Sequence, residues 1–397
     1  MQIEKLETNK LIPYVNNSRT HSENQVSQVA ASITEFGFNN PILIDKKNTI
    51  IAGHGRLLAA QKLGLPEVPC VRLEHLTETQ KKAYIIADNK LALNAGWDEE
   101  LLSLELNGLE EDGFDTSLIG FDEKEMAQIL SGNPKDGLTG DDELPEVSEN
   151  AQTKEGNLYK LGVHRLLCGD STEENVVNRL FDGQTVDLLL TDPPYGVNYA
   201  EKNTFLNKFD KGNRVQKHIQ NDEIENLEEF LGKFLQVIPF SETNIFYIFF
   251  AGQQLHHIQS ALNLAKLKLS QYLVWNKNNH VLSRTDYLYK HEFILYGWKN
   301  KHKFYGKKGT TVIDHPRPLK NELHPTMKPV GLLTRLIEDG SLPNQNIYDP
   351  FLGSGSTLIA AEKINRKCFG IEKDPIYCDV MIKRWEDFTG SKAKLID

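Results

Sequence analysis

The chain has 397 residues, which is too long for one ordinary hydrophobic core, and a net charge of -10. Its content of 39% hydrophobic and 25% charged residues excludes a disordered protein. Its apolar runs fall far short of the roughly 20 residues that cross a bilayer, and the first residues lack the apolar core of a secretory leader, so no membrane passage is expected. Four cysteines without a C-x-x-C pair indicate reduced thiols in a cytoplasmic protein, without a zinc or other metal site.

The negative charge is concentrated in one part of the chain. Residues 1–150 hold 13 basic and 26 acidic side chains, whereas the remainder holds 32 and 29. Within that remainder, residues 277–328 carry 11 Lys or Arg against 4 acids, together with five histidines. Because the local potential steers a charged partner more than the net charge does, we expect a polyanion to meet this basic stretch.

The amino-terminal part predicts a small α+β domain followed by a linker. Apolar runs over residues 41–45 and 49–52 predict two strands, and residues 56–63 predict a helix. Asp98 and Asp122 precede apolar series and predict two further helix starts. Beyond them, Gly, Pro and acidic residues without an apolar period predict an exposed segment. We therefore expect a first domain over residues 1–95, a helical extension over 96–130, an acidic linker over 131–156 and a second domain over 157–397.

Beyond the linker, apolar strands alternate with helices. Strands are predicted over residues 186–190, 245–250, 347–348 and 368–371, with helices such as 227–237 and 357–363 between them. This alternation predicts an α/β fold with a Rossmann-like, doubly wound and mostly parallel sheet, in which ligands bind at the carboxyl ends of the strands. Residues that follow these strands are therefore the first candidates for a functional site.

The turn Asp192-Pro193-Pro194-Tyr195 follows the first of these strands. An amino group on a nucleobase is a poor nucleophile because its lone pair is delocalised into the ring, so a catalyst must hold its N–H groups with acceptors. Asp192 would accept one N–H, the Pro194 carbonyl would accept the other, and Tyr195 would stack on the base. Such a pocket requires a base that is flipped out of the duplex. A structural turn at a strand end is the alternative.

A glycine-rich loop follows the strand predicted over residues 347–348. It reads Asp-Pro-Phe-Leu-Gly-Ser-Gly-Ser-Thr from Asp349 to Thr357 and leads into a helix, so its backbone can approach a ligand beside a helix start. Glu372, at the end of the next strand, is placed as the acid that binds ribose hydroxyls in dinucleotide enzymes. The alternatives are a plain tight turn and a nicotinamide site, and the lack of G-x-G-x-x-G disfavours the second.

Together these motifs resemble the amino-group DNA methyltransferases over about residues 157–388. The turn precedes the loop, as in the β group of that family, whereas the loop comes first in the glutamine methyltransferases that act on proteins. The resemblance implies methyl transfer from S-adenosylmethionine to adenine N6 in double-stranded DNA, without a metal. It implies catalysis by Asp192, Pro193, Pro194 and Tyr195, and cofactor binding by Asp170, Lys328, Asp349, Phe351, Gly353, Gly355, Thr357 and Glu372.

Three further segments are similar to that family. Residues 168–170 resemble the acidic element that meets the cofactor adenine, residues 291–296 the strand that shapes the base pocket, and residues 324–329 the segment leading into the cofactor loop. For sequence readout we expect residues 199–220 and 299–323, because both are polar and the second is rich in cations that suit phosphates. The candidate DNA contacts are Lys299, Lys301, Lys303, Lys307, Lys308 and Arg317.

The first domain resembles the ParB-like domains, and the related sulfiredoxins, over about residues 1–95. Gly53, His54, Gly55 and Arg56 open the predicted helix and are similar to the ParB nucleotide-binding box, in which backbone donors and a cation bind phosphates. The resemblance implies CTP or another nucleotide at these four residues. Sulfiredoxin activity needs a cysteine where Gly53 stands and is not expected. A helix-capping turn is the structural alternative.

Two other interpretations stay open. Cytosine N4 could be the target, since the same acceptors serve either amine, although enzymes of that specificity more often carry Ser in the position of Asp192. The chain could instead be a ParB-like nucleotide- or DNA-binding module with an inactive methyltransferase domain, and the intact Asp192, Tyr195, Gly353 and Glu372 speak against that. The resemblance implies a bacterial or phage origin and a restriction-modification context, and it leaves open whether the protein is a homodimer.

Overall fold

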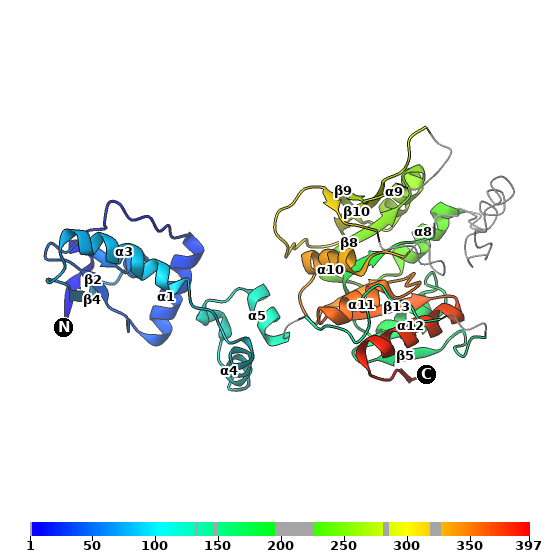
Figure 1. Cartoon of the computed structure of the whole chain (residues 1–397), viewed down its shortest axis with the longest axis horizontal. Coiled ribbons are helices and arrows are strands. Elements are labelled where there is room, and N and C mark those ends of the chain that lie inside the picture. The colour runs from blue at the N-terminus through cyan, green and yellow to red at the C-terminus, as the bar shows by residue number, and fades with distance from the viewer. Residues whose placement is uncertain (1, 132–133, 147–149, 195–225, 281–285, 318–326) are drawn as a thin grey trace. The chain divides into compact units, whose positions relative to one another are not determined.

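The computed structural model describes residues 2–131, 134–146, 150–194, 226–280, 286–317 and 327–397. Within them the chain forms two compact units, Met1–Gly132 and Asn133–Asp397 (Figure 1). No helix among the described residues is long and apolar enough to span a bilayer.

The first unit contains a four-stranded sheet in the order β1-β4-β2-β3. Buried aliphatic side chains of the sheet and of α2, among them Ile42, Ile44 and Leu57, form its core. The expected strands and helix are confirmed, within one or two residues at each end. The elements are β1 (Ile3–Glu7), η1 (Thr8–Lys10), α1 (Glu23–Phe36), β2 (Ile42–Ile44), β3 (Ile50–Ala52), α2 (His54–Lys62), β4 (Glu67–Arg72) and α3 (Glu78–Ala92).

Two further α-helices complete the first unit, and both expected helix starts are confirmed. Asp98 accepts the Leu101 N–H at 3.2 Å and so caps the first. Asp122 and Glu125 cap the second reciprocally, with N–H to carboxylate distances of 2.8 and 2.9 Å. The elements are α4 (Glu99–Glu111), η2 (Thr116–Ile119) and α5 (Glu123–Ser131).

The described residues of the second unit form a ten-stranded sheet in the order β11-β9-β10-β8-β7-β12-β13-β6-β5-β14. Its centre, β8-β7-β12-β13-β6, is parallel, whereas β10 runs antiparallel to both of its neighbours. The strands are β5 (Leu158–Leu161), β6 (His164–Cys168), β7 (Val186–Thr191), β8 (Phe240–Phe250), β9 (Lys268–Asn276), β10 (His291–Trp298), β11 (Val312–Asp314), β12 (Asn346–Asp349), β13 (Lys367–Glu372) and β14 (Lys394–Leu395).

Helices cover both faces of this sheet. Leu188 and Leu190 of β7 share a buried cluster with α10, α11 and α12, while Leu189 shares another with α6, α8 and α9. Burial on both faces explains why the middle of β7, Leu188 to Leu190, is apolar without alternation. The expected fold class, a doubly wound α/β sheet with a smaller α+β domain, is confirmed. The helices are α6 (Glu174–Phe181), α8 (Leu227–Gln236), η3 (Gly252–Gln254), α9 (Leu255–Leu264), α10 (Val330–Gly340), α11 (Ser356–Lys363) and α12 (Pro375–Thr389).

The strand order reverses between β7 and β12. From β7 the sheet continues outward to β8, and from β12 it continues to β13 on the other side. The connections that follow the two strands therefore leave in opposite directions, and this is the place where doubly wound sheets bind ligands. Asp192 follows β7, and Asp349 ends β12.

The acidic segment after α5, which we expected to be an exposed linker, forms hydrogen bonds to other parts of the second unit. The Lys135 N–H donates to the Lys363 carbonyl at 2.7 Å, and Asp142 accepts the N–H of Val330, the first residue of α10, at 2.9 Å. Residues 134–146 are exposed or partly exposed, and some of their acids also serve as acceptors for the second unit, including one at a helix start.

Candidate active site

Asp349 is a buried acid at the carboxyl edge of the central strands. It is 4% exposed and accepts hydrogen bonds from the hydroxyls of Thr357 (2.7 Å) and Thr191 (2.8 Å). Burial raises the pKa of Asp349 to about 6, although both hydrogen bonds oppose the shift. Because Thr191 ends β7, this carboxylate joins the ends of two adjacent strands.

The loop after β12 turns on two glycines before α11 begins. Gly353 and Gly355 have φ of +55° and +81°, in the left-handed region that favours glycine. A Cβ at Gly355 would also lie 2.9 Å from Cγ of Met381. The Gly353 N–H donates to Glu372 at 2.9 Å, so the loop and the acid at the end of β13 hold one another in place.

Two acids follow the next strands along the same edge. Burial raises the pKa of Glu372 to about 7, although backbone N–H groups donate to its carboxylate. Burial favours a higher pKa for Asp170, which follows β6. Hydrogen bonds from Lys373 and Thr172 outweigh burial, so the pKa of Asp170 is below its ordinary value. Neither acid belongs to a metal-binding cluster, since the described residues contain no group of three potential ligands. The edge therefore offers carboxylates to hydroxyl and amino groups.

Asp192 directly follows β7, the strand next to the one that leads into the glycine loop. β7 and β12 are adjacent and parallel, so Asp192 and Gly353 leave the sheet at the same edge, as a shared pocket requires. Asp192 accepts a hydrogen bond from the ammonium of Lys328. Tyr195 is outside the described residues, so its stacking on a base stays a prediction.

Lys328 joins Asp192 to a second carboxylate, Glu292. Its Nζ lies 3.3 Å from Glu292 Oε2 and 5.0 Å from the centre of the Phe249 ring, and the other oxygen of Glu292 pairs with Lys277. Burial lowers the pKa of Lys328, but Asp192 and Glu292 outweigh burial and raise it well above its ordinary value. We expected Lys328 to bind the cofactor; its contacts place it beside Asp192, and cofactor binding stays a prediction.

Sequence reasoning did not single out Glu292 or Lys277 as site residues. β10 is antiparallel to β8, with Phe293 opposite Phe250, so the second residue of β10 arrives at the edge where β8 ends. Lys277 reaches the same edge because it directly follows β9. The signal that could have revealed Glu292 is its position in the segment 291–296, which resembles the strand of the base pocket.

Two residues expected to bind the cofactor also hold the loop in place. The buried Thr357 donates its hydroxyl hydrogen to Asp349. The Phe351 ring packs edge-on against Phe234 of α8, with ring centres 5.0 Å apart. Their contacts with a cofactor remain predictions.

Part of the basic stretch lies away from Asp192. Because β10 is antiparallel to β8, Lys299 comes after the end of β10 at the opposite edge, where its N–H donates to Asn244 at 2.8 Å. Lys301 pairs with Glu242 at that edge, at 2.6 Å. These two lysines therefore lie at the edge of the sheet opposite Asp192, and their contact with DNA stays a prediction.

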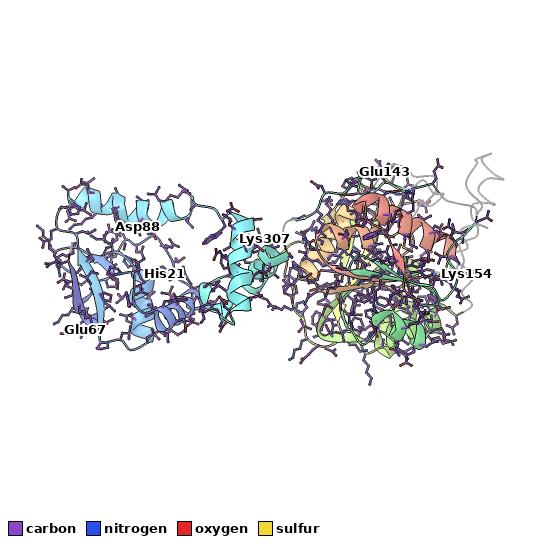
Figure 2. The ribbon with its side chains drawn as sticks, turned by 90° about the horizontal axis from the view of Figure 1, so that it is seen from below. His21, Glu67, Asp88, Glu143, Lys154 and Lys307 are labelled. Atoms are coloured by element: carbon purple, nitrogen blue, oxygen red, sulfur yellow. The ribbon has the colours of Figure 1, made fainter. Side chains whose placement is uncertain are left out.

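The end of the stretch lies at the edge of the sheet where Asp192 follows β7. β11 is parallel to β9, and Arg317 follows it, its backbone N–H donating to Asn278 at 3.0 Å. Lys303, Lys307 and Lys308 are exposed, and Figure 2 labels Lys307. The expected readout segment 199–220, and the part of 299–323 beyond Arg317, lie outside the described residues.

In the first unit the glycine turn has a different environment. Gly53 has a φ of +104° and is the N-cap of α2, and the guanidinium of Arg56 lies against it. A Cβ at Gly55 would lie 3.1 Å from the ring of His21, which Figure 2 labels. Burial, followed by the nearby His21, lowers the pKa of His54. The turn therefore presents a cation and a helix start together.

The fold and this edge define a methyltransferase of the Rossmann-like class, with a carboxylate turn beside a glycine loop. Residues 186–384 match the DNA methylase family N6_N4_Mtase, and the chain belongs to this family, whose methyl donor is S-adenosylmethionine. Residues 1–89 match the ParB N-terminal domain, and residues 100–155 match the ParB-methyltransferase HTH domain. The match to the HTH domain covers α4 and α5, to which sequence reasoning had given no function.

Among the curated relatives, one is similar to the ParB-like part of this chain and another to its methyltransferase part. The ParB-like nuclease domain-containing protein YnaK of Escherichia coli is 52% identical over 73 residues, 18% of this chain and 84% of its own. The putative methylase YubD of Escherichia coli is 29% identical over 210 residues, 52% and 84% of the two chains. The crystal structure of the M1.HpyAVI–SAM complex matches at 23% identity with a TM-score of 0.41, covering 55% of this chain and 97% of that chain.

Proposed function

We propose that this DNA methyltransferase transfers the methyl group of S-adenosylmethionine to N6 of adenine in double-stranded DNA, after the base flips out of the duplex. One observation carries the proposal: Asp192 and the glycine loop stand at the switch point of the sheet, where the Thr191 hydroxyl hydrogen-bonds Asp349 at 2.8 Å. A methyl donor at the loop and an amine at the turn would then meet in one place.

The residues present fit this cofactor. Glu372 would accept the ribose hydroxyls, and Asp170 would accept from the adenine amino group. The backbone of the glycine loop, with Asp349 beneath it, would hold the methionine part, and the cofactor supplies a methyl group activated by a sulfonium. The buried acids favour a ligand with hydroxyl and cationic groups over one with phosphates.

The chain's own groups would act on the target amine. Asp192 and the Pro194 carbonyl accept its two N–H groups and keep its lone pair directed at the methyl carbon. The same two acceptors stabilise the nitrogen as positive charge develops on it, an electrostatic contribution that grows in the transition state. Holding both reactants in line supplies a large part of the rate, on the order of 7 to 11 kcal/mol for well oriented groups.

The test is transfer of tritiated methyl groups to genomic DNA from a methylation-deficient strain, followed by mass spectrometry of the nucleosides. N6-methyladenine is the expected product, because an aspartate stands at the first position of the turn. If the product is N4-methylcytosine instead, the target base is cytosine and not adenine. No transfer to any DNA would favour a binding module with an inactive domain.

For the first unit we propose a nucleotide site at Gly53, His54, Gly55 and Arg56. A helix start with a positive-φ glycine and a guanidinium suits a triphosphate such as CTP. Calorimetry with CTP should show binding that Arg56→Ala weakens at least tenfold while methyl transfer is kept. Identical affinities in the two proteins would contradict the site.

A further inference from the structure

Four charged side chains alternate in sign beside the catalytic turn. Lys277, whose side chain is 6% exposed, pairs with Glu292; Lys328, 11% exposed, bridges Glu292 and Asp192. They come from the end of β9, the start of β10, the segment before α10 and the end of β7. Two lysines and two carboxylates leave the cluster with no net charge. Ammonium groups buried this far are stable only with such partners.

Methyl transfer changes the charge next to this cluster. As the bond from the methyl carbon to sulfur breaks and the bond to nitrogen forms, the sulfonium becomes a neutral thioether and positive charge passes to the amine, which then loses a proton to solvent. An uncompensated ammonium at Lys328 would oppose that charge in a poorly solvated place. Glu292 compensates it, and Lys277 keeps Glu292 ionised and oriented.

We propose that Glu292 is a positioning residue for methyl transfer, which holds the Lys328 ammonium against Asp192 and balances its charge so that Asp192 meets the target amine as an oriented, ionised acceptor. The inference rests on the proposed function. Glu292 acts through Lys328, whose three donors can serve both carboxylates at once. The contacts on Lys328 fix its direction, with the Phe249 ring 5.0 Å from the ammonium.

Two substitutions of Glu292 separate charge from packing. Glu292→Gln keeps the size and loses the charge, whereas Glu292→Asp keeps the charge and shortens the side chain. In steady-state tritium transfer with the full-length protein, we expect Glu292→Gln to lower kcat by roughly tenfold or more, with KM for S-adenosylmethionine within about twofold, and Glu292→Asp to retain more activity. A packing role predicts the reverse order, and that order would overturn the proposal.

A matched control and a third variant complete the design. Glu229 in α8 forms an exposed pair with Lys233 at 2.8 Å, so Glu229→Gln removes an ion pair that shares no residue with the cluster and should leave kcat unchanged. Lys277→Gln leaves both carboxylates that contact Lys328 in place and should lose less activity than Glu292→Gln. An equal or larger loss in Lys277→Gln would overturn the charge argument, even if the Glu292 variants fail to fold.

The two levels of the hypothesis can fail separately. A wild-type protein that methylates no DNA sinks the proposed function. A wild-type protein that methylates DNA while Glu292→Gln matches its kcat sinks the role of Glu292 alone.

Discussion

Two glycine turns of this chain share one backbone design. Gly53 follows β3 and is the N-cap of α2 with a φ of +104°; Gly355, after β12, is the N-cap of α11 with a φ of +81°. In each, a buried strand ends, a glycine turns the chain and a helix start opens beside it. Local sequence therefore builds the same structure in both units.

The two turns differ in the charge that surrounds them. Asp349 and Glu372 lie around the turn of the second unit, whereas Arg56 and two histidines, His54 and His21, lie around the turn of the first. Carboxylates suit hydroxyls and a sulfonium, and a guanidinium suits phosphates. The glycine turn provides room for a ligand, and the neighbouring side chains decide which ligand it is.

The largest expected effect separates binding from chemistry within the second site. Asp192→Ala should lower methyl transfer at least about 100-fold, because the amine loses its charged acceptor, while calorimetry finds S-adenosylmethionine binding little changed. Loss of cofactor binding to the same degree would place Asp192 in the cofactor site and remove its distinct role.

The next effect tests whether the two turns select their ligands by charge. Glu372→Gln should weaken S-adenosylmethionine roughly tenfold or more, since the amide is a weaker acceptor for ribose hydroxyls, and leave CTP binding at the other turn unchanged. Arg56→Ala should show the opposite pattern. The measurement is calorimetry on both variants with both ligands. If each variant weakened the binding of both ligands equally, the two turns would not select their ligands by charge.

The pKa of about 7 for Glu372 predicts a pH dependence of cofactor affinity. Hydroxyl donors favour the ionised carboxylate, so binding should be tight above pH 7 and weaken as pH falls through 7, by up to about tenfold per pH unit with release of one proton. Binding of S-adenosylmethionine from pH 6 to 8 checks this, with Glu372→Gln as the control. A wild-type affinity independent of pH would contradict the ribose role.

A smaller effect compares the two glycines directly. Alanine is strained at either φ, but at Gly355 the new Cβ also lies 2.9 Å from Met381, whereas at Gly53 it meets the flexible end of Arg56 at 3.0 Å. We expect Gly355→Ala to destabilise its unit by about 2 kcal/mol or more and Gly53→Ala by about 1 kcal/mol. Thermal unfolding should show a larger drop in Tm for Gly355→Ala, and equal drops would remove the distinction.

The smallest expected effect concerns two exposed cations that belong to neither turn. The double variant Lys307→Ala with Lys308→Ala should weaken DNA binding and reduce the slope of log affinity against log salt by about 1 to 2, as expected for two lost phosphate contacts. Fluorescence anisotropy across a salt series measures the slope. An unchanged slope would show that these two lysines do not contact DNA phosphates.

Sequence alone predicted the elements that carry the motifs. The strand expected over residues 186–190 is Val186–Thr191, and the helix expected over 357–363 is Ser356–Lys363. Apolar runs, glycine turns and helix caps act over a few residues, so these features could be found without tertiary contacts. The order of the turn and the loop along the chain was enough to indicate the family.

Only the tertiary structure revealed which distant residues share an edge. Glu292 and Lys277 reach Asp192, and Lys299 lies away from it, because β10 runs antiparallel in a sheet whose centre is parallel. The acidic residues 134–146 are bound to the second unit for a similar reason, since their partners, such as Val330 and Lys363, are some two hundred residues away in sequence. Strand direction and long-range ion pairs depend on how the whole sheet assembles, and no local pattern of residues determines them.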